Sequence, residues 1–358
     1  MTASESSASP VRPLLVRCGA LGDMVILTPL IRRLAERYGA SVDLLSSGGW
    51  TLPLLRGQPH VGDLILLKSR KTPYWLSPRQ WDAVATLRRR PRGPVFLCED
   101  TPQTSALLRR AGIRAEDLLD AYAVDGAAGE VQRHSLERWQ DLAERSPPAW
   151  PASGPPSVAP FVPRMEVLPA AQSEFLRWRA RQPFARGPLV LLQPGNKRTL
   201  KRGRLATQGH HKHWPAERWA QLAAHVLAAL PEAHVLLCGA PPERGVLDEI
   251  AVLCDRGRVH NLADDLPIPR LIALCAAARS MVSVDTVPAH LAAALNCPLV
   301  VLFGNASPAR WAPRSPAAPV VCLGGDVEGL DRVEQIAAGR VLRAWDWLCV
   351  RATDPQPH

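Results

Sequence analysis

The sequence predicts an α/β fold with two doubly wound domains, each built on a parallel sheet, and three observations support this. Apolar β-like runs alternate with amphipathic segments along the whole chain. The runs of the second half are almost continuously apolar, as strands buried on both faces of a parallel sheet are. The chain has 358 residues, 47% of them hydrophobic, which is too long for one typical core and enough for two.

The N-terminal half begins with a small, polar stretch that has the features of a tail. Residues 1–10 contain no basic segment followed by an apolar one, so no secretory signal is predicted and a disordered tail is expected. Two amphipathic helices are expected, one around Leu30, Ile31 and Leu34 and another around Leu136, Trp139 and Leu142. Short apolar runs predict strands at residues 14–16, 42–45, 64–67, 83–86 and 95–98.

The C-terminal half repeats this alternation after a proline-rich linker that starts at about residue 146. A helix is expected from Pro215, as its first residue, to just before Pro231. A last helix is expected over residues 330–348. Strands are predicted at residues 189–193, 234–239, 281–285 and 299–304. The predicted organisation is a tail at 1–10, domains at 11–165 and 166–330, and a C-terminal helix at 331–350.

Charge and cysteine content limit the function classes. The formal net charge is +10, and basic residues cluster at 197–212 and again around Arg88–Arg90, Arg109 and Arg110. Such clusters attract polyanions such as nucleic acid, an anionic membrane or a phosphorylated substrate, although they can equally be solvated surface. The eight cysteines include no C-x-x-C pair and lie mostly in apolar runs, which indicates buried side chains in a reducing compartment, the cytoplasm.

The first candidate site is the loop from Gly19 to Asp23, between a predicted strand and a predicted helix. Its glycine spacing matches neither the dinucleotide-binding motif nor the P-loop. Asp23 can cap the helix that follows. Alternatively, Thr28 and Pro29 begin that helix, and Asp23 then lies in a loop or irregular turn that is freer to face a cleft.

Two further candidates lie at predicted helix starts in the second half. Lys212, in the segment HHKHWP, precedes a helix and suits an anion site, although a single lysine is often only solvated. The neighbouring histidines have no carboxylate or cysteine at a ligand spacing, so no metal is expected.

Asp285 and Thr286 end a buried strand directly before a helix. This geometry offers N–H groups to a phosphate and a carboxylate to sugar hydroxyls, or else Asp285 is only a cap.

Together these motifs resemble glycosyltransferase family 9, the ADP-heptose:lipopolysaccharide heptosyltransferases. The motifs are GALGD, QPGN…KHWPAERWAQLA, CGAPPER and SVDTVPAHLAAALNCPLVVLFG, in this order over residues 14–311. The resemblance implies a GT-B fold, with two Rossmann-like domains facing a central cleft. It also implies that the second domain binds the nucleotide-sugar donor and the first binds the acceptor.

The resemblance also implies roles for single residues. Asp23 matches the general base, and Lys212 matches the lysine on the donor phosphates. Glu243 matches the acid that holds the ribose, Asp285 the acid near the donor sugar, and Thr286 a residue beside the phosphates. Val287 stands where many members have glycine, and the loop between Gly195 and Lys212 is longer than usual. The donor side also includes Gly195 and Asn196, and the acceptor side Gly19, Gly22, Arg88 and Arg89.

The chemistry expected from the resemblance is an inverting transfer of a heptose from ADP-heptose to a lipopolysaccharide core acceptor. A carboxylate takes the acceptor proton, while Lys212 and a helix N-terminus meet the charge on the leaving ADP, with no metal and no further cofactor. The expected partners are the nucleotide sugar and an anionic glycolipid at the cytoplasmic face of the inner membrane, reached through Arg88–Arg90 and the 197–204 loop.

Other functions stay open at this point. A family relative could use another nucleotide sugar or a protein acceptor, or the chain could be a nucleotide- or polyanion-binding protein without catalysis. Retention of Asp23 together with Lys212 argues against the second alternative, since a binder would need only the donor side. A nucleic-acid partner is not expected, because the basic loop lacks interleaved aromatic residues.

Overall fold

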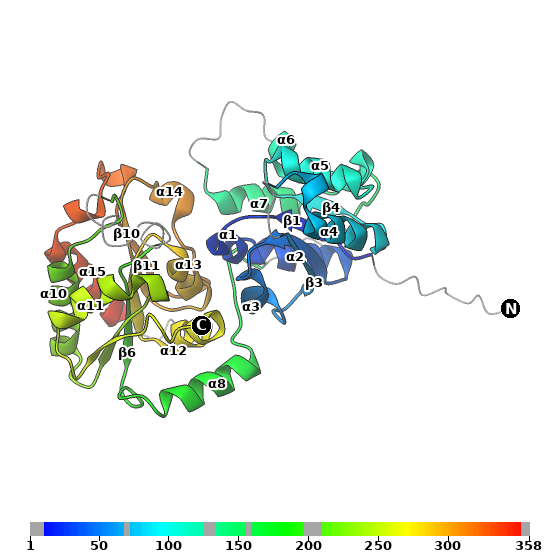
Figure 1. Cartoon of the computed structure of the whole chain (residues 1–358). Helices are drawn as coiled ribbons and strands as arrows, with labels where there is room; N and C mark the ends of the chain where they lie inside the picture. Colours follow the sequence, from blue (N-terminus) through cyan, green and yellow to red (C-terminus); the bar gives the residue numbers. More distant parts are fainter. Residues whose placement is uncertain are drawn as a thin grey trace. The chain divides into compact units, whose positions relative to one another are not determined.

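The computed structural model describes residues 11–67, 72–124, 133–152, 154, 159–196 and 210–351, which form two compact units (Figure 1). The first unit extends to Phe161 and the second begins at Val162, within the proline-rich stretch. Each unit holds one parallel sheet with helices on both faces.

The first unit has a five-stranded sheet in the order β3-β2-β1-β4-β5. All its strand pairs are parallel. The chain winds from the central strand outward to one edge and then returns to build the other, which makes β1 and β4 the point where the winding direction switches. The strands are β1 (Leu14–Arg17), β2 (Val42–Ser47), β3 (Val61–Leu67), β4 (Val95–Leu97) and β5 (Leu118–Asp120).

Helices cover both faces of this sheet because its strands are apolar on both sides. On one face α4 and α5 enclose a core with β1, β3 and β4. On the other, α2 packs against β2 and α7. The helical segments are α1 (Leu21–Ile26), α2 (Thr28–Tyr38), α3 (Thr51–Leu55), η1 (Tyr74–Leu76), α4 (Pro78–Arg89), α5 (Pro102–Arg110), η2 (Ala115–Asp117), α6 (Ala121–Val124) and α7 (Ser135–Ala143).

The second unit has a six-stranded parallel sheet in the order β11-β10-β9-β6-β7-β8. This is the strand order of the dinucleotide-binding Rossmann fold, with the switch point between β6 and β9. The register sets Gln193 beside Ser283, so the loops after these two strands leave the same edge of the sheet. The strands are β6 (Leu189–Gln193), β7 (His234–Leu237), β8 (Val259–Asn261), β9 (Ser280–Val284), β10 (Leu299–Phe303) and β11 (Val320–Gly324).

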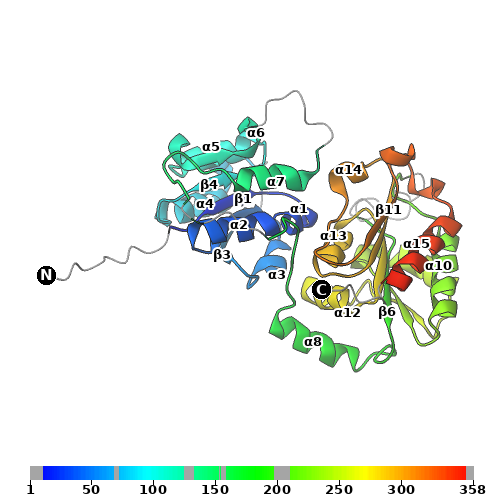
Figure 2. The same ribbon diagram turned by 180° about the vertical axis from the view of Figure 1, so that it is seen from behind.

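The main core of the second unit lies between the sheet and α10, α11 and α15. Trp345 of α15 is buried there and donates a hydrogen bond from its indole to Ser280 Oγ at 3.0 Å, which fixes the last helix to the sheet. Figure 2 shows α15 beside α10. The helical segments are α8 (Pro169–Arg179), α10 (Ala216–Ala229), η4 (Pro241–Glu243), α11 (Arg244–Val252), α12 (Ile268–Ala277), α13 (Val287–Ala294), α14 (Pro308–Trp311), η5 (Asp326–Glu328), η6 (Val333–Gln335) and α15 (Ala338–Arg351).

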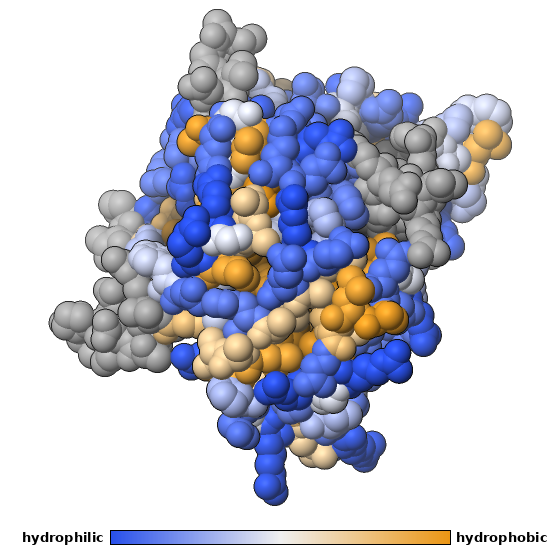
Figure 3. Space-filling model, turned by 90° about the vertical axis from the view of Figure 1, so that its left-hand side faces the viewer, coloured by the Kyte–Doolittle hydropathy of each residue, from blue (hydrophilic) through white to orange (hydrophobic). Residues whose placement is uncertain are grey.

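The outer side of the second unit, where α10 and α11 lie, is mixed in polarity. Figure 3 shows hydrophilic residues around a smaller apolar area on this side. Val252 at the end of α11 and the next residue, Leu253, are exposed apolar side chains. Isolated exposure of this kind is common on protein surfaces.

Three sequence-based element predictions are corrected by the structure. Residues 83–86 are not a strand but the middle of α4, because Pro78 starts a helix whose buried side chains, Gln80, Ala83, Val84 and Leu87, recur at helical spacing. The last helix begins at Ala338 and not at residue 330 or 331, since two short 3-10 turns precede it. Pro215 is the N-cap of α10 and not its first residue.

Candidate active site

Asp23 lies in the first turn of α1, directly after the carboxyl end of β1. Its Oδ2 accepts a hydrogen bond from the backbone N–H of Ala20 at 2.6 Å. The carboxylate thus supports the start of the short helix α1, whose N-cap is Ala20 and whose third residue is Asp23. The longer helix α2 begins at Thr28 and Pro29, as the alternative interpretation predicted, but Asp23 lies in α1 and not in an irregular loop. The side chain nevertheless stays 24% exposed. It can therefore serve the helix and still meet a substrate.

Arg17, the last residue of β1, holds the other oxygen of Asp23. Its Nη2 donates to Asp23 Oδ1 at 3.0 Å, and its Nη1 donates to the Cys98 carbonyl at 2.6 Å. Burial alone would lower the pKa of Arg17, but Asp23 and Tyr122 raise it overall through charge and hydrogen bonding. Sequence reasoning missed Arg17. The available signal was a charged residue at the end of an apolar run.

Glu99 is a second carboxylate at the switch point of the first sheet. It follows β4, is buried, and accepts a hydrogen bond from the Cys18 N–H at 2.7 Å through Oε2. The hydroxyls of Thr101 and Thr104 donate to its Oε1. Glu99 therefore ties the end of β4 to the loop that precedes α1. Sequence reasoning missed it too, although acidic residues directly after an apolar strand are a usable signal.

The two glycines predicted on the acceptor side have different surroundings. A Cβ built on Gly19 would lie 2.3 Å from Asp23 Oδ2, so only glycine leaves room for the carboxylate to reach the Ala20 N–H. Gly22 is buried within α1. The structure therefore gives Gly19 a specific reason to be glycine, namely the position of Asp23.

In the second unit, Lys212 and Asp285 form an ion pair. Lys212 Nζ lies 2.7 Å from Asp285 Oδ2 and 2.6 Å from the backbone carbonyl of the same residue. The lysine side chain is 22% exposed and the aspartate side chain 12%. Two residues far apart in the sequence thus meet at the carboxyl end of β9. The ammonium group is already neutralised when no ligand is bound.

Thr286 and Val287 begin the helix that follows Asp285. Thr286 is the N-cap of α13 in an extended conformation, and its side chain makes no capping hydrogen bond. Pro288, the second residue of α13, has no N–H, and the Ala289 N–H donates to the Thr286 carbonyl at 3.1 Å, which leaves the N–H of Val287 as the first-turn donor for a bound anion. Val287 is the first residue of α13 and is half-buried.

Glu243 is buried at the end of η4, after β7. Its Oε2 accepts the Ala240 N–H at 2.7 Å, whereas no described residue hydrogen-bonds its buried Oε1. A Cβ built on Gly195 would lie 2.1 Å from this Oε1, so Gly195 provides the space that Glu243 occupies. Burial raises the pKa of Glu243 to about 7, although the Ala240 N–H opposes this effect. The free oxygen is an unfilled acceptor at the carboxyl edge of the sheet.

The pKa of Glu243 predicts a pH-dependent stability for the unliganded protein. The raised pKa means that the folded state holds this proton more tightly than the unfolded state does. Stability should therefore fall as the pH rises from 4.5, the ordinary value, to about 7, by at most about 3 kcal/mol. Urea unfolding of the wild type and of Glu243→Gln over this range measures it. A stability difference that does not change with pH would contradict the prediction.

Asn196 and Lys212 line one small pocket of the second unit, together with His210 and residues of α11. His210 Nδ1 accepts the Lys212 N–H at 3.1 Å, which orients the lysine backbone. In the part of the chain that the structure describes, no group of three or more His, Cys, Asp or Glu residues is placed to hold a metal ion. The predicted donor residues thus gather after β6, β7 and β9.

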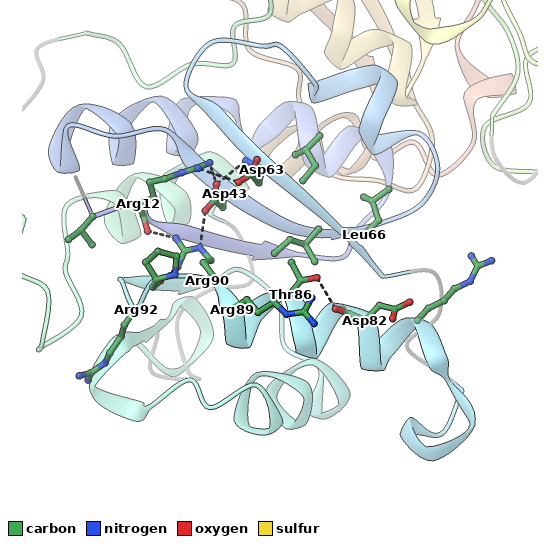
Figure 4. A pocket seen from close by; sticks show the side chains of 15 residues that line it. Arg12, Asp43, Asp63, Leu66, Asp82, Thr86, Arg89, Arg90 and Arg92 are labelled. Atoms are coloured by element: carbon green, nitrogen blue, oxygen red, sulfur yellow. Dashed lines mark hydrogen bonds and ion pairs between the residues drawn. The ribbon is translucent and has the colours of Figure 1, made fainter. Parts of the chain in front are cut away.

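Arg88 and Arg89 are not brought together with Asp23. They end α4, which runs back from the carboxyl edge of the sheet towards the start of β4, whereas Asp23 follows the carboxyl end of β1. Arg88 donates to the Arg110 carbonyl at 2.7 Å. Arg89 lines a cavity of about 910 Å³ between β3 and α4 (Figure 4).

Arg90 belongs to a buried ion cluster and not to the free basic surface expected from the sequence. Its Nε lies 2.8 Å from Asp43 Oδ2, and Arg12 also pairs with Asp43 (Figure 4). Its charge is therefore already neutralised inside the fold. The expected basic loop at 197–204 lies outside the described residues.

The chain is similar in sequence to known heptosyltransferases. Residues 164–338 match the family described as glycosyltransferase family 9 (heptosyltransferase). Lipopolysaccharide heptosyltransferase 2 of Escherichia coli K12 is 26% identical over 321 residues, which cover 85% of each chain. Lipooligosaccharide heptosyltransferase 2 of Haemophilus influenzae is 24% identical over 85% of this chain and 86% of its own.

Solved structures share the fold. The structure of E. coli ADP-heptose LPS heptosyltransferase II has a TM-score of 0.74 at 23% identity, with 96% of this chain and all of that chain covered. E. coli heptosyltransferase WaaC with ADP has a TM-score of 0.70 at 19% identity, over 94% and 99% of the two chains. These similarities confirm the GT-B fold class expected from the sequence.

No helix within the described ranges combines the length and the apolar character needed to cross a bilayer.

Proposed function

Because the chain is a glycosyltransferase of family 9, we propose that it transfers a heptose from ADP-heptose to a lipopolysaccharide core acceptor. The observation that carries the donor half of this proposal is the Lys212–Asp285 ion pair at the start of α13. It combines a cation, a carboxylate and the N–H of Val287 at the switch point of a Rossmann-type sheet. This is the place where nucleotides bind in such folds.

The donor is proposed to bind the second unit through three kinds of contact. The pyrophosphate lies at the N-terminus of α13, near Thr286, and takes part of the charge of Lys212. Ribose hydroxyls donate to the free Oε1 of Glu243, an atom that lacks a partner among the described residues. Asp285 faces the hydroxyls of the sugar. Gly195 and Asn196 complete the site beside Glu243 and Lys212.

Asp23 is proposed as the general base for the acceptor. The acceptor hydroxyl oxygen bonds to the anomeric carbon, its proton passes to the Asp23 carboxylate, and the bond from that carbon to the phosphate oxygen breaks with its electron pair on ADP. This displacement inverts the anomeric configuration. Arg17 is the positioning residue, since its hydrogen bond fixes one carboxylate oxygen.

The leaving group needs positive groups that act as the bond breaks. Charge grows on the ADP oxygen in the transition state, so preorganised cations and N–H groups there lower the barrier more than they strengthen donor binding. Lys212 and the first turn of α13 are the proposed groups. The stabilisation of the charge on the leaving ADP is thus proposed to come from residues of this chain.

The nucleotide and sugar are tested most directly by binding and transfer. Calorimetric titration with ADP, UDP and GDP should show a clear preference for ADP. Transfer from ADP-heptose to a panel of truncated core acceptors, followed by mass spectrometry, should add one heptose to one of them. Tight binding of UDP or GDP in place of ADP would instead favour a family relative with another donor.

A nucleotide-binding protein without catalysis is the second candidate. The geometry around Asp23 argues against it, because Arg17 and Gly19 both serve to place this carboxylate. ADP binding without transfer to any acceptor in the panel would support this second candidate.

The close fit of Gly195 against Glu243 leads to a further prediction. Gly195→Ala should weaken ADP binding by about ten-fold or more, because a Cβ would collide with the ribose-binding carboxylate and displace it. Calorimetry with ADP measures the effect. Gly245→Ala is the matched control, since a Cβ there meets no atom within 4 Å. Equal affinities for the two variants would remove Glu243 from the donor site.

A further inference from the structure

The first unit exposes three large apolar side chains within seven residues. Trp75 is 71% exposed, Leu76 55% and Trp81 45%. They belong to η1 and the first turn of α4. A single exposed apolar residue needs no explanation, but two tryptophans and a leucine gathered on adjacent elements are typical of an interaction surface.

Contacts through Tyr74, the neighbour of Trp75 in the sequence, link Trp81 to arginines from α4 and α5. The Trp81 indole donates to the Tyr74 carbonyl at 2.7 Å. The Arg110 guanidinium stands 4.7 Å from the centre of the Tyr74 ring. Arg88 then donates to the Arg110 carbonyl at 2.7 Å. The tryptophans and the arginines therefore share one continuous surface, which we call the aromatic–basic surface.

The arginines of this surface keep their full charge. Arg79, Arg88 and Arg110 are exposed, and among the described residues none of them pairs with a carboxylate. This distinguishes them from Arg90 and Arg92, which form ion pairs within the unit. Asp82 is the exposed acid closest to them in sequence. Among the described residues, the surface thus presents arginines that have no carboxylate partner.

From these observations we propose that the aromatic–basic surface docks the protein on an anionic lipid bilayer. Tryptophan prefers the boundary between headgroups and acyl chains, because its ring is apolar and its N–H is polar. Arginines beside such a ring meet anionic headgroups, and each contributes to binding. Trp75 and Leu76 enter the boundary region, while Arg79, Arg88 and Arg110 contact the headgroups. This docking is separate from the donor site.

Vesicle co-sedimentation tests the proposal without any substrate. The wild type should bind vesicles of phosphatidylcholine with phosphatidylglycerol, and bind pure phosphatidylcholine much more weakly. Trp75→Ser with Leu76→Ser should abolish most of this binding. Arg79→Gln with Arg110→Gln should weaken it by about five-fold for each arginine. Added salt should weaken the wild type as well.

Matched controls come from the second unit. Val252→Ser with Leu253→Ser removes comparable exposed apolar surface, and Arg256→Gln with Arg343→Gln removes two exposed arginines. All four variants should keep the wild-type melting temperature and bind ADP normally. Transfer to a soluble acceptor without a lipid anchor should also stay unchanged, so a failure of docking is distinguishable from a failure of the proposed function.

Three results would overturn the proposal. The first is wild-type binding to anionic vesicles by the aromatic variant. The second is a wild type that binds neither kind of vesicle. The third is a lipid-free dimer that the Trp75→Ser, Leu76→Ser variant dissociates, as seen by size-exclusion chromatography with light scattering, because the surface would then join two copies of the chain.

Discussion

Replacing Asp23 by asparagine is expected to lower heptose transfer by about 10²–10⁴-fold, because the acceptor proton then has no base to accept it. Binding of ADP should remain close to that of the wild type, since Asp23 lies in the first unit and the proposed donor residues lie in the second. Single-turnover transfer and calorimetry with ADP measure the two quantities. Wild-type turnover in this variant would leave Asp23 with its role at the helix start alone.

The structural role of Asp23 calls for a control. Its carboxylate accepts the Ala20 N–H and binds Arg17, so asparagine also disturbs the start of α1. The expected cost of a lost helix cap is about 1 kcal/mol, a fraction of the stability of a domain. Arg17→Met removes the Arg17 contact while keeping the carboxylate. It should lower transfer less than Asp23→Asn does, and unequal melting temperatures would show how much of each loss is structural.

Replacing Lys212 by methionine is expected to lower turnover by about 10²–10³-fold and to weaken ADP binding by a smaller factor. The reason is that the ammonium group meets a charge that grows as the bond to ADP breaks. Steady-state kinetics with ADP-heptose and calorimetry with ADP separate the two effects. Unchanged kinetics would exclude Lys212 from the reaction.

The Lys212–Asp285 ion pair complicates the interpretation of the single variant, but it also suggests a double variant that separates two causes. Without Lys212, the carboxylate of Asp285 stands alone and repels the pyrophosphate, so the single variant mixes two causes. The double variant Lys212→Met, Asp285→Asn removes both charges. If Lys212 served only to neutralise Asp285, the double variant should recover most of the activity. We expect it to stay slow, because the leaving group still lacks its cation.

Strong periodic signals in the sequence predicted most of the fold. The central strands are apolar on both sides, and helices α2, α7, α10 and α15 have clear apolar stripes, so these elements were predicted. Strands β5, β8 and β11 were missed, and each lies at a sheet edge, where burial imposes little pattern. Residues 83–86 were assigned to a strand because a short apolar run alone does not distinguish the two states.

The candidate site was predictable only in part. Asp23, Lys212 and Asp285 were found because each lies at or just before a predicted helix start, whereas Glu243 was found through the family resemblance alone. Contacts between distant segments were not visible in the sequence, such as the pairing of Lys212 with Asp285 or of Arg17 with Asp23. Gly19 and Gly195 illustrate the same limit. The atoms that a Cβ would meet at these positions belong to the carboxylates of Asp23 and Glu243, and the sequence alone does not show these contacts.

The carboxylate of Asp285, which lies beside Lys212, is also expected to affect the release of ADP at the end of the catalytic cycle. If ADP binds Lys212 as proposed, the lysine can return to Asp285, 2.7 Å away, when ADP leaves. The electrostatic free energy that the nucleotide gains from Lys212 is then only the difference between its own attraction to the lysine and that of Asp285. We therefore expect product inhibition by ADP to be limited. Removing the carboxylate alone, in Asp285→Asn, should prolong the residence time of ADP, so that product release becomes a slower step of turnover.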